Sequence, residues 1–279
     1  MTSKGPTERP QSAEDDALAR HREALRAHFP LPEPKPRKAS KTRVGSALAV
    51  ILAAGVIWLD PAYRHEQHVS AVGERQMVEL ADGSRVQLDS DTRLNVSWHL
   101  RSRRVELSTG QALFDVSKAW VRPFRVEAGD TRISVLGTQF NVLRQDGGAR
   151  VALLRGSVDI YSSQLPAQQV RLKPGEQVDV RQGRLQPVAR ADVDSVLAWR
   201  ERRLVFARTP LGEVLAHVQR YRQGHIQLQD PSLADLPITG VFDADKADEL
   251  LDLLPRILPL NLARAADGSV SITRRATKR

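Results

Sequence analysis

VGSALAVILAAGVIWL, residues 44–59, is the only long uncharged apolar run in this chain, and it separates a short basic segment from a long polar one. As an α-helix it would span about 24 Å, against roughly 30 Å for the hydrocarbon core of a bilayer. Basic side chains before the run can snorkel, and Trp58 and Tyr63 suit the far headgroup zone. The sequence therefore predicts a single-pass membrane protein with a transmembrane signal anchor over residues 44–63.

The charges beside this run predict its orientation. The positive-inside rule keeps a basic flank in the cytoplasm, and five basic residues precede the run: Lys35, Arg37, Lys38, Lys41 and Arg43. A cleaved signal peptide is also basic and then apolar, but a 43-residue leader is too long for one, and WLDPAY offers no small-x-small cleavage site. We therefore expect residues 1–43 in the cytoplasm and the C-terminus on the outer side of the membrane.

The composition fits this layout and argues against nucleic-acid binding. The 279 residues contain no cysteine, which excludes disulfides and thiolate metal sites. Ten of the 42 Lys and Arg residues fall in the first 43 positions, where topology already accounts for them. The others are interleaved with acids, and the sparse aromatics do not form the stacking surface that nucleic acid needs. We expect no direct nucleic-acid partner despite the net charge of +9.

The cytoplasmic tail contains one predicted amphipathic helix. Ser12 suits its N-cap, Leu18, Leu25 and Phe29 form an apolar stripe at helical spacing, and Pro30 ends it. A lone helix of about four turns cannot bury such a stripe by itself. Two interpretations therefore stay open: a disordered leader with transient helix, or a helix that docks in the groove of a cytoplasmic partner.

Beyond the anchor, apolar residues alternate with polar ones. Apolar-x-apolar pairs recur about every eight to ten residues from Val78 to Val180, separated by turn signals such as Asp82-Gly83. This predicts an all-β domain over residues 64–190, outside the membrane, either a β-solenoid or sandwich-like. A loose repeat places a glycine two to four residues before several of these pairs, at Gly110, Gly137, Gly156 and Gly175.

The pattern changes near residue 194 to that of a small α+β domain over residues 195–275. A short strand at 204–206 is followed by Thr209 as a predicted N-cap and Pro210 at the first helical position. The remaining periodicities complete the order β-α-β-β-α-β-β, with a second helix over residues 245–254.

Catalytic and metal-binding patterns are absent from the sequence. Gly147-Gly148 sits in a hairpin turn, not in a phosphate-binding loop, and no G-x-S-x-G elbow occurs. His65 and His68 are three residues apart but lack a third ligand nearby, so we interpret them as part of a polar stalk. Asp89 and Asp91 are interpreted as turn residues. We therefore predict no conventional enzyme, no cofactor and no metal.

Five sequence blocks resemble the FecR family of inner-membrane sensors, and they occur in the family's order behind the anchor. They are LADGSRVQL (80–88), VELSTGQALFDV (105–116), RPFRVEAG (122–129), VLGTQFNV (135–142) and VALLRGSVDI (151–160). The 195–275 segment is similar to the secretin/TonB short N-terminal domain that ends such proteins. Because that domain type also occurs in secretins, a membrane-anchored structural adaptor of an envelope or secretion assembly is the alternative.

The resemblance implies an anti-sigma factor, a regulator of transcription that works from the membrane. This membrane would be the bacterial inner membrane, crossed once, with the N-terminus in the cytoplasm and the C-terminus in the periplasm. The regulator's cytoplasmic segment, here with Leu18, Leu25 and Phe29, would bind an extracytoplasmic-function sigma factor. Its outer part would receive a signal from the periplasmic domain of a TonB-dependent outer-membrane receptor, typically one that takes up an iron chelate. Many relatives carry a longer tail with tryptophan, whereas these 43 residues have none, so the tail can act as inhibitor or activator.

Gly137-Thr138 matches the bond at which several family members cut themselves. The threonine hydroxyl can attack the preceding carbonyl carbon, which breaks the amide and leaves an ester that water then hydrolyses. Glycine on the carbonyl side removes the Cβ that would block this approach and tolerates a strained backbone. In an arbitrary protein the same dipeptide is an ordinary turn before a strand. Such a cut would ease removal of the outer part by envelope proteases.

Overall fold

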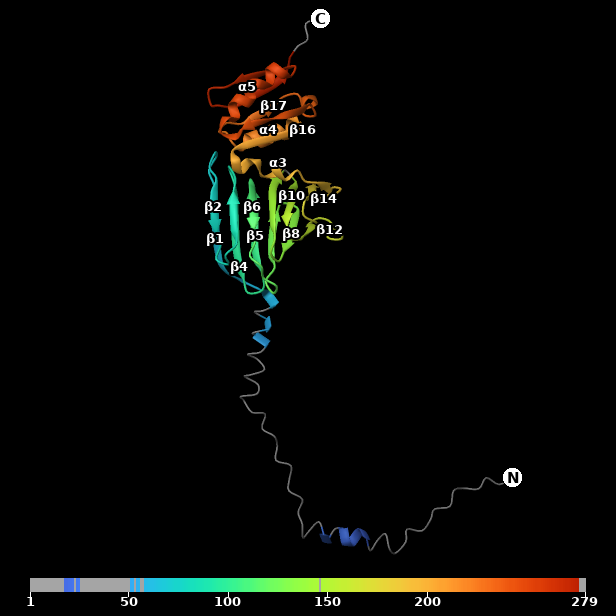
Figure 1. Cartoon of the computed structure of the whole chain (residues 1–279). Helices are drawn as coiled ribbons and strands as arrows, with labels where there is room; N and C mark the ends of the chain where they lie inside the picture. The colour runs from blue at the N-terminus through green and yellow to red at the C-terminus, as the bar shows by residue number, and fades with distance from the viewer. Residues whose placement is uncertain are drawn as a thin grey trace, which may run out of the picture. The chain divides into compact units, whose positions relative to one another are not determined.

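The computed structural model describes residues 18–22, 24, 25, 51, 52, 54, 55, 58–145 and 147–275 (Figure 1). The chain divides into two units, residues 1–53 and residues 54–279. In the first unit, the described residues 18–22, 24 and 25 are helical, as the tail pattern predicted.

Most of the predicted membrane crossing, residues 44–63, lies outside the described residues. Within the part of the chain that the structure covers, no helix combines the length and apolarity that a bilayer crossing requires. Phe29 of the tail stripe also lies outside the described residues, whereas Leu18 and Leu25 are 64% and 57% exposed.

The second unit begins with a β domain made of two facing sheets (Figure 1). In spatial order the first sheet contains β1 (Ala62–Val69), β4 (Arg93–His99), β5 (Arg103–Thr109), β7 (Phe124–Ala128), β8 (Thr131–Val135), β11 (Val158–Ser162) and β12 (Gln169–Leu172). The second contains β2 (Gln76–Glu79), β3 (Arg85–Leu88), β6 (Gln111–Asp115), β9 (Gln139–Gln145), β10 (Gly148–Arg155), β13 (Glu176–Arg181) and β14 (Arg184–Leu185), with β15 (Ala189–Arg190) beside β13.

One apolar core fills the space between the sheets, as in a sandwich. Phe114 stacks on Phe140 of its own sheet at 5.1 Å between ring centroids and meets the edge of Phe124 from the other sheet at 6.1 Å. Strand number rises along both sheets, and the late strands β12 and β13 lie beside each other. The chain thus advances stepwise as in a solenoid while its cross-section is that of a sandwich. Among the described strands of this β domain, only β5 and β7 pair in parallel.

The glycines of the predicted repeat stand at four of the places where the chain passes from one sheet to the other. These glycines stand between β5 and β6, β8 and β9, β10 and β11, and β12 and β13: Gly110, Gly137, Gly156 and Gly175. At Gly110 the backbone has φ +87°, and a Cβ would lie 2.2 Å from the Thr92 hydroxyl oxygen. A side chain is excluded there, because the turn that redirects the chain packs directly on the neighbouring turn.

The predicted polar stalk at residues 65–68 is wrong, because these residues form half of strand β1. This strand pairs antiparallel with β4, from Ala62 opposite His99 to Val69 opposite Arg93. It is an edge strand with mostly exposed side chains, so it lacks the apolar alternation that revealed the others. The fold begins still earlier, at the buried Asp60, whose carboxylate accepts hydrogen bonds from the Arg101 backbone N–H and the Ser102 hydroxyl.

The C-terminal α+β domain follows, with its own apolar core. Its elements are α3 (Val193–Leu197), β16 (Arg203–Pro210), α4 (Leu211–Gln219), β17 (Ile226–Leu228), β18 (Pro237–Asp243), α5 (Ala247–Ile257), β19 (Leu260–Arg264) and β20 (Val270–Arg274). Short 3₁₀ turns cover Ala198–Glu201, Pro231–Leu233 and Ala244–Lys246. β16 pairs with β18, and β20 lies between β17 and β19. The predicted order of two helices among five strands is confirmed.

One detail of this domain differs from the prediction. Thr209 is not the N-cap of α4 but part of β16, and Pro210 takes the cap position without a side-chain hydrogen bond. The first free N–H groups of the helix are satisfied by backbone carbonyls instead. Leu211 N–H donates to Leu236 and Gly212 N–H to Ala234, at 2.8 and 2.9 Å. Because a loop distant in sequence caps the helix, no local side-chain signal was needed.

Candidate functional site

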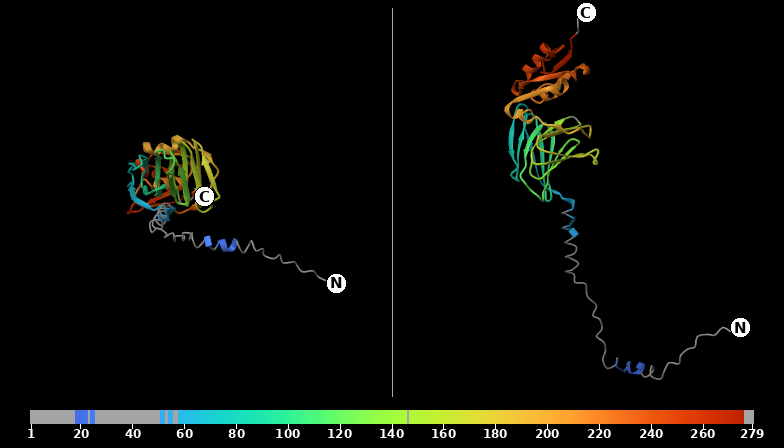
Figure 2. Two further views of the ribbon diagram at one scale, coloured as in Figure 1. Left: turned by 90° about the horizontal axis from the view of Figure 1, so that it is seen from below. Right: turned by 45° about the vertical axis from the view of Figure 1, so that its right-hand side comes forward.

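The strand registers give the β domain two opposite ends (Figures 1 and 2). At the entry end the chain arrives at Asp60, beside the β4–β5 turn, the loop of residues 116–123 and the Gly137-Thr138 turn. At the junction end lie the turns around residues 70–75, 89–92, 109–110 and 145–148. The C-terminal domain makes its hydrogen bonds and ion pairs to this junction end.

A buried carboxylate, Asp89, is the centre of the contact between the two domains. It is 0% exposed and follows directly after β3. Its Oδ2 accepts hydrogen bonds from the Arg220 guanidinium at 3.1 Å and from the Tyr221 hydroxyl. Arg75 of the β domain lies 3.7 Å from Oδ1. The interpretation of Asp89 as a plain turn residue is therefore wrong, since the charge is neutralised by two arginines that close over it.

Neighbouring groups reinforce this contact. The Ser90 hydroxyl donates to the backbone carbonyl of Arg220, and Arg220 also donates to the Gln111 side-chain oxygen at 3.0 Å. Burial and then the Asp89 carboxylate raise the pKa of Tyr221, whose hydroxyl therefore stays protonated as a donor. The end of α4 is thus held to the β domain by several polar groups at once.

A second ion pair ties the start of α4 to the other side of the β domain. Arg150 of β10 forms salt bridges with Asp179 of β13 at 2.6 Å and with Glu213 of α4 at 2.7 Å. Burial lowers the pKa of Arg150, but the hydrogen bond and charge of Asp179, followed by Glu213, raise it further than burial lowers it. The guanidinium therefore remains charged and bridges the two domains.

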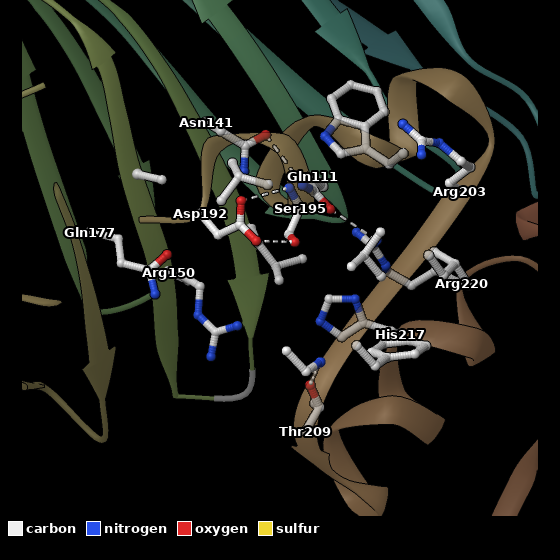
Figure 3. Close-up of a pocket in the computed structure, with 18 of the residues that line it drawn as sticks. Gln111, Asn141, Arg150, Gln177, Asp192, Ser195, Arg203, Thr209, His217 and Arg220 are labelled. Carbon is white, nitrogen blue, oxygen red and sulfur yellow. Dashed lines mark hydrogen bonds between the residues drawn. The ribbon is translucent and has the colours of Figure 1, made fainter. Parts of the chain in front are cut away.

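Between these two contacts lies a cavity of about 420 Å³, lined by both domains (Figure 3). Figure 3 shows the hydrogen-bonded chain from Asn141 through Gln111 to Arg220 along one wall. Several nitrogen atoms around the cavity have no protein partner among the described residues: Trp199 Nε1, His217 Nε2, and Nε and Nη1 of Arg220. Burial, followed by the charges of Arg220 and Arg150, lowers the pKa of His217 to about 3, so its ring is neutral at pH 7.

The Gly137-Thr138 bond lies at the entry end, between β8 and β9. The Thr138 hydroxyl is buried and donates to the Ser157 carbonyl at 2.9 Å. A Cβ on Gly156 would lie 3.0 Å from this hydroxyl oxygen and 3.2 Å from the Gly137 carbonyl oxygen. Gly137 itself has no positive φ; it is required because a Cβ would lie 2.4 Å from Lys118 Cγ. The glycine at 137 is therefore explained by close packing and not by backbone strain.

The remaining predicted residues are not brought together into a site. Leu18 and Leu25 are exposed in the first unit. The described residues contain no group of three or more His, Cys, Asp or Glu that could hold a metal ion. His68 Nε2 lies 3.5 Å from Glu66 Oε2 in β1, where the two side chains form a pair on the sheet.

The sequence profile of the FecR protein family matches residues 66–159, which cover most of the two sheets. A second profile, for the FecR C-terminal domain, matches residues 203–272. The chain belongs to the FecR family. Both profiles occur in order and correspond to the two domains that meet at Asp89.

Two crystal structures of a candidate anti-sigma factor from Parabacteroides distasonis resemble this FecR-family chain. Their TM-scores are 0.66 and 0.65, with 25% and 26% sequence identity. Each comparison covers 76% of this chain and 100% of the solved chain. No curated protein matches the chain significantly in sequence. The predicted likeness of the last domain to the secretin/TonB short N-terminal domain stays a prediction, since the matching profile is the FecR C-terminal one.

Proposed function

We propose that this chain is an inner-membrane anti-sigma factor that controls an extracytoplasmic-function sigma factor. In this proposal it relays a signal from the periplasmic domain of a TonB-dependent outer-membrane receptor that takes up an iron chelate. The observation that carries the proposal is the order of the parts. A basic tail and an apolar run precede the FecR match at residues 66–159, and the FecR C-terminal match at residues 203–272 follows.

The tail is proposed to bind the sigma factor. Leu18 and Leu25 lie on the described helical residues and are exposed, as an unoccupied docking stripe requires. Large apolar side chains on a helix without its own core are the groups expected to contribute most to such binding.

The C-terminal domain is proposed to receive the signal. Among the described strands, β18 of this domain pairs only with β16, and Val241 on β18 is 59% exposed. A strand from the receptor's periplasmic domain can add to such a free edge. The polar junction at Asp89 and Arg150 then transmits the binding event, because it holds α4 by directional ion pairs and leaves several buried nitrogens unpaired. Such an interface is easier to rearrange than a close-packed apolar one.

The test is a pull-down from cytoplasmic extract with residues 1–43 as bait. We expect a sigma factor to be retained by the wild-type segment and lost with the double substitution Leu25→Asp and Phe29→Asp. A double substitution on the opposite face of the same predicted helix, Arg20→Ser with Glu23→Ser, is the matched control and should retain it. Equal recovery with all three baits, or with none, would reject the sigma-factor proposal.

A further inference from the structure

The entry end of the β domain carries large apolar side chains that the core does not use. Trp120 and Val121, in the loop of residues 116–123, are 83% and 86% exposed. Tyr63, Leu100 and Leu136 are exposed on the neighbouring elements. These five residues are called the entry patch. Exposed apolar groups gathered at one place mark a surface that contacts a partner or a membrane.

The registers show that these residues share one end of the domain. Ala62 at the start of β1 lies opposite His99, and Arg103 at the start of β5 lies beside Phe124, which in turn lies opposite Val135. The loops are also connected directly. Arg122 donates to the Tyr63 hydroxyl and to the His99 carbonyl, and the Ala119 N–H donates to the Leu136 carbonyl.

No spacer separates this end from the apolar run of the sequence. The run ends at Leu59, and Asp60 is already fixed to the domain by hydrogen bonds from Arg101 N–H at 2.8 Å and Ser102 Oγ at 2.9 Å. Trp58 and Leu59 are themselves exposed. One residue spans at most about 3.6 Å, so a membrane crossing that ends at Leu59 leaves the entry end within the headgroup layer.

We propose that the entry patch docks on the outer face of the inner membrane, with Trp120 and Val121 inserted among the lipid headgroups. This inference rests on the single membrane crossing in the proposed function and adds a second contact with the same bilayer. Tryptophan favours the headgroup zone because its ring is apolar and its N–H is polar. Lys118 and Arg122 flank the two residues and suit the phosphates of anionic lipids.

The docking has a consequence for the Gly137-Thr138 bond. This bond directly follows Leu136 of the entry patch, and Gly137 packs on Lys118 of the same loop as Trp120. The candidate cleavage bond therefore lies at the membrane surface, next to the segment on which an intramembrane protease would act.

The experiment uses the full-length chain in liposomes of phosphatidylethanolamine and phosphatidylglycerol. Because the chain has no cysteine, Trp120→Cys can be labelled uniquely with an environment-sensitive fluorophore. Val241→Cys, an exposed apolar position in the C-terminal domain, is the matched control. We expect lipids with a quencher at the headgroup-proximal acyl position to quench the label at position 120 several-fold more than at 241. Val121→Cys repeats the measurement if the first variant does not fold.

The outcomes separate this inference from the function on which it rests. If the chain fails to float with liposomes, the membrane anchor itself is wrong. If it floats but the labels at 120 and 121 are quenched no more than the label at 241, the anchor stands and the docking is overturned. Disulfide-linked dimers of the unlabelled Trp120→Cys chain, together with no quenching of the labelled chain, would assign the entry patch to a second copy of the chain and would also overturn the docking.

Discussion

At the scale of single residues, the buried charge of Asp89 connects the β domain to the C-terminal domain. It is wholly buried, and its partners Arg220 and Tyr221 come from a domain more than a hundred residues later. Removing one partner of a buried ion pair typically costs roughly 3–5 kcal/mol, because the other charge stays buried without compensation. Here the group left without its carboxylate is Arg220, whereas Arg75 keeps a salt bridge to Asp245 at 3.5 Å.

We therefore expect Asp89→Ala to lower the free energy of unfolding by about 3 kcal/mol, measured by chemical denaturation. Asp89→Asn should cost less, because an amide oxygen can still accept from Tyr221. Asp115→Ala is the control: it removes an exposed salt bridge to Arg155 and should cost less than about 1 kcal/mol. A loss in Asp89→Ala no larger than in this control would mean that the junction contributes little to stability.

Thr138 gives the second prediction at this scale. If the hydroxyl attacks the Gly137 carbonyl carbon, the purified outer part should run as two fragments that meet at this bond. Thr138→Ala should leave one intact chain, whereas Thr138→Ser keeps the oxygen nucleophile and should still cut. Gly156→Ala should slow the cut, because it puts a Cβ 3.0 Å from the hydroxyl and forces alanine to φ +94°.

Intact mass spectrometry measures this directly. Thr131→Ala, which alters another buried threonine at the opposite end of β8, is the control and should cut like the wild type. A single full-length mass for the wild type would remove self-cleavage from the mechanism. The glycine at position 137 would then be explained only by its close packing against Lys118.

At the scale of elements, the sequence revealed those strands whose apolar residues alternate toward the core. β9 and β10 lie in the middle of a sheet, and their period-two pattern was sufficient to predict them. β1 was missed because an edge strand with exposed side chains has no such pattern. The cap of α4 was misplaced because carbonyls from the loop before β18, not Thr209, satisfy its first N–H groups.

His217 in helix α4 should make the free energy of unfolding depend on pH. The ring packs against Phe206, and the cations facing it are Arg220 on its own helix and Arg150 from the β domain. Burial and these charges lower the pKa of His217 from its ordinary 6.5 to about 3. Because the unfolded chain binds the proton more readily, the free energy of unfolding falls as pH drops below about 6.5.

Protonation of His217 in the unfolded chain lowers the free energy of unfolding by about 1.4 kcal/mol when the pH falls from 7.5 to 5.5. We expect His217→Gln, which cannot titrate, to lose that part of the pH dependence. Denaturation of wild type and variant at both pH values gives the comparison, and the other histidines cancel between them. Parallel pH dependence in the two proteins would show that His217 is not protonated selectively on unfolding.

At the scale of the whole molecule, the sequence predicted the order of the parts but not the junction. The FecR-like blocks and the α+β pattern are each local, so they could be read along the chain. The contacts of Asp89 with Arg220 and of Arg150 with Glu213 join residues far apart in sequence. The sequence around Asp89 is that of an ordinary turn, and the sequence around Glu213 is that of an ordinary helix surface. These two pairings could therefore be found only from the three-dimensional structure.

The junction leads to a prediction about signalling. If the C-terminal domain receives the inducing signal, a chain that ends at residue 194 should stay in the membrane but no longer respond to inducer. Transcription from a sigma-dependent reporter, with and without the iron source, measures the response, and immunoblotting of membranes controls for protein level. An unchanged induction ratio in this truncated chain would place the receiving surface on the β domain instead.

The orientation of the chain supports the last prediction. Five basic residues precede the apolar run, and the polar domains follow it, so the positive-inside rule predicts that the C-terminus lies in the periplasm. Alkaline phosphatase fused after Arg279 should therefore be active, because it matures only outside the cytoplasm. Green fluorescent protein at the same position, exported unfolded, should be dark. Both reporters fused after residue 43 form the control and should behave in the opposite way. An inactive phosphatase and a fluorescent green fluorescent protein at the C-terminus would place both domains in the cytoplasm, where no outer-membrane receptor could contact them.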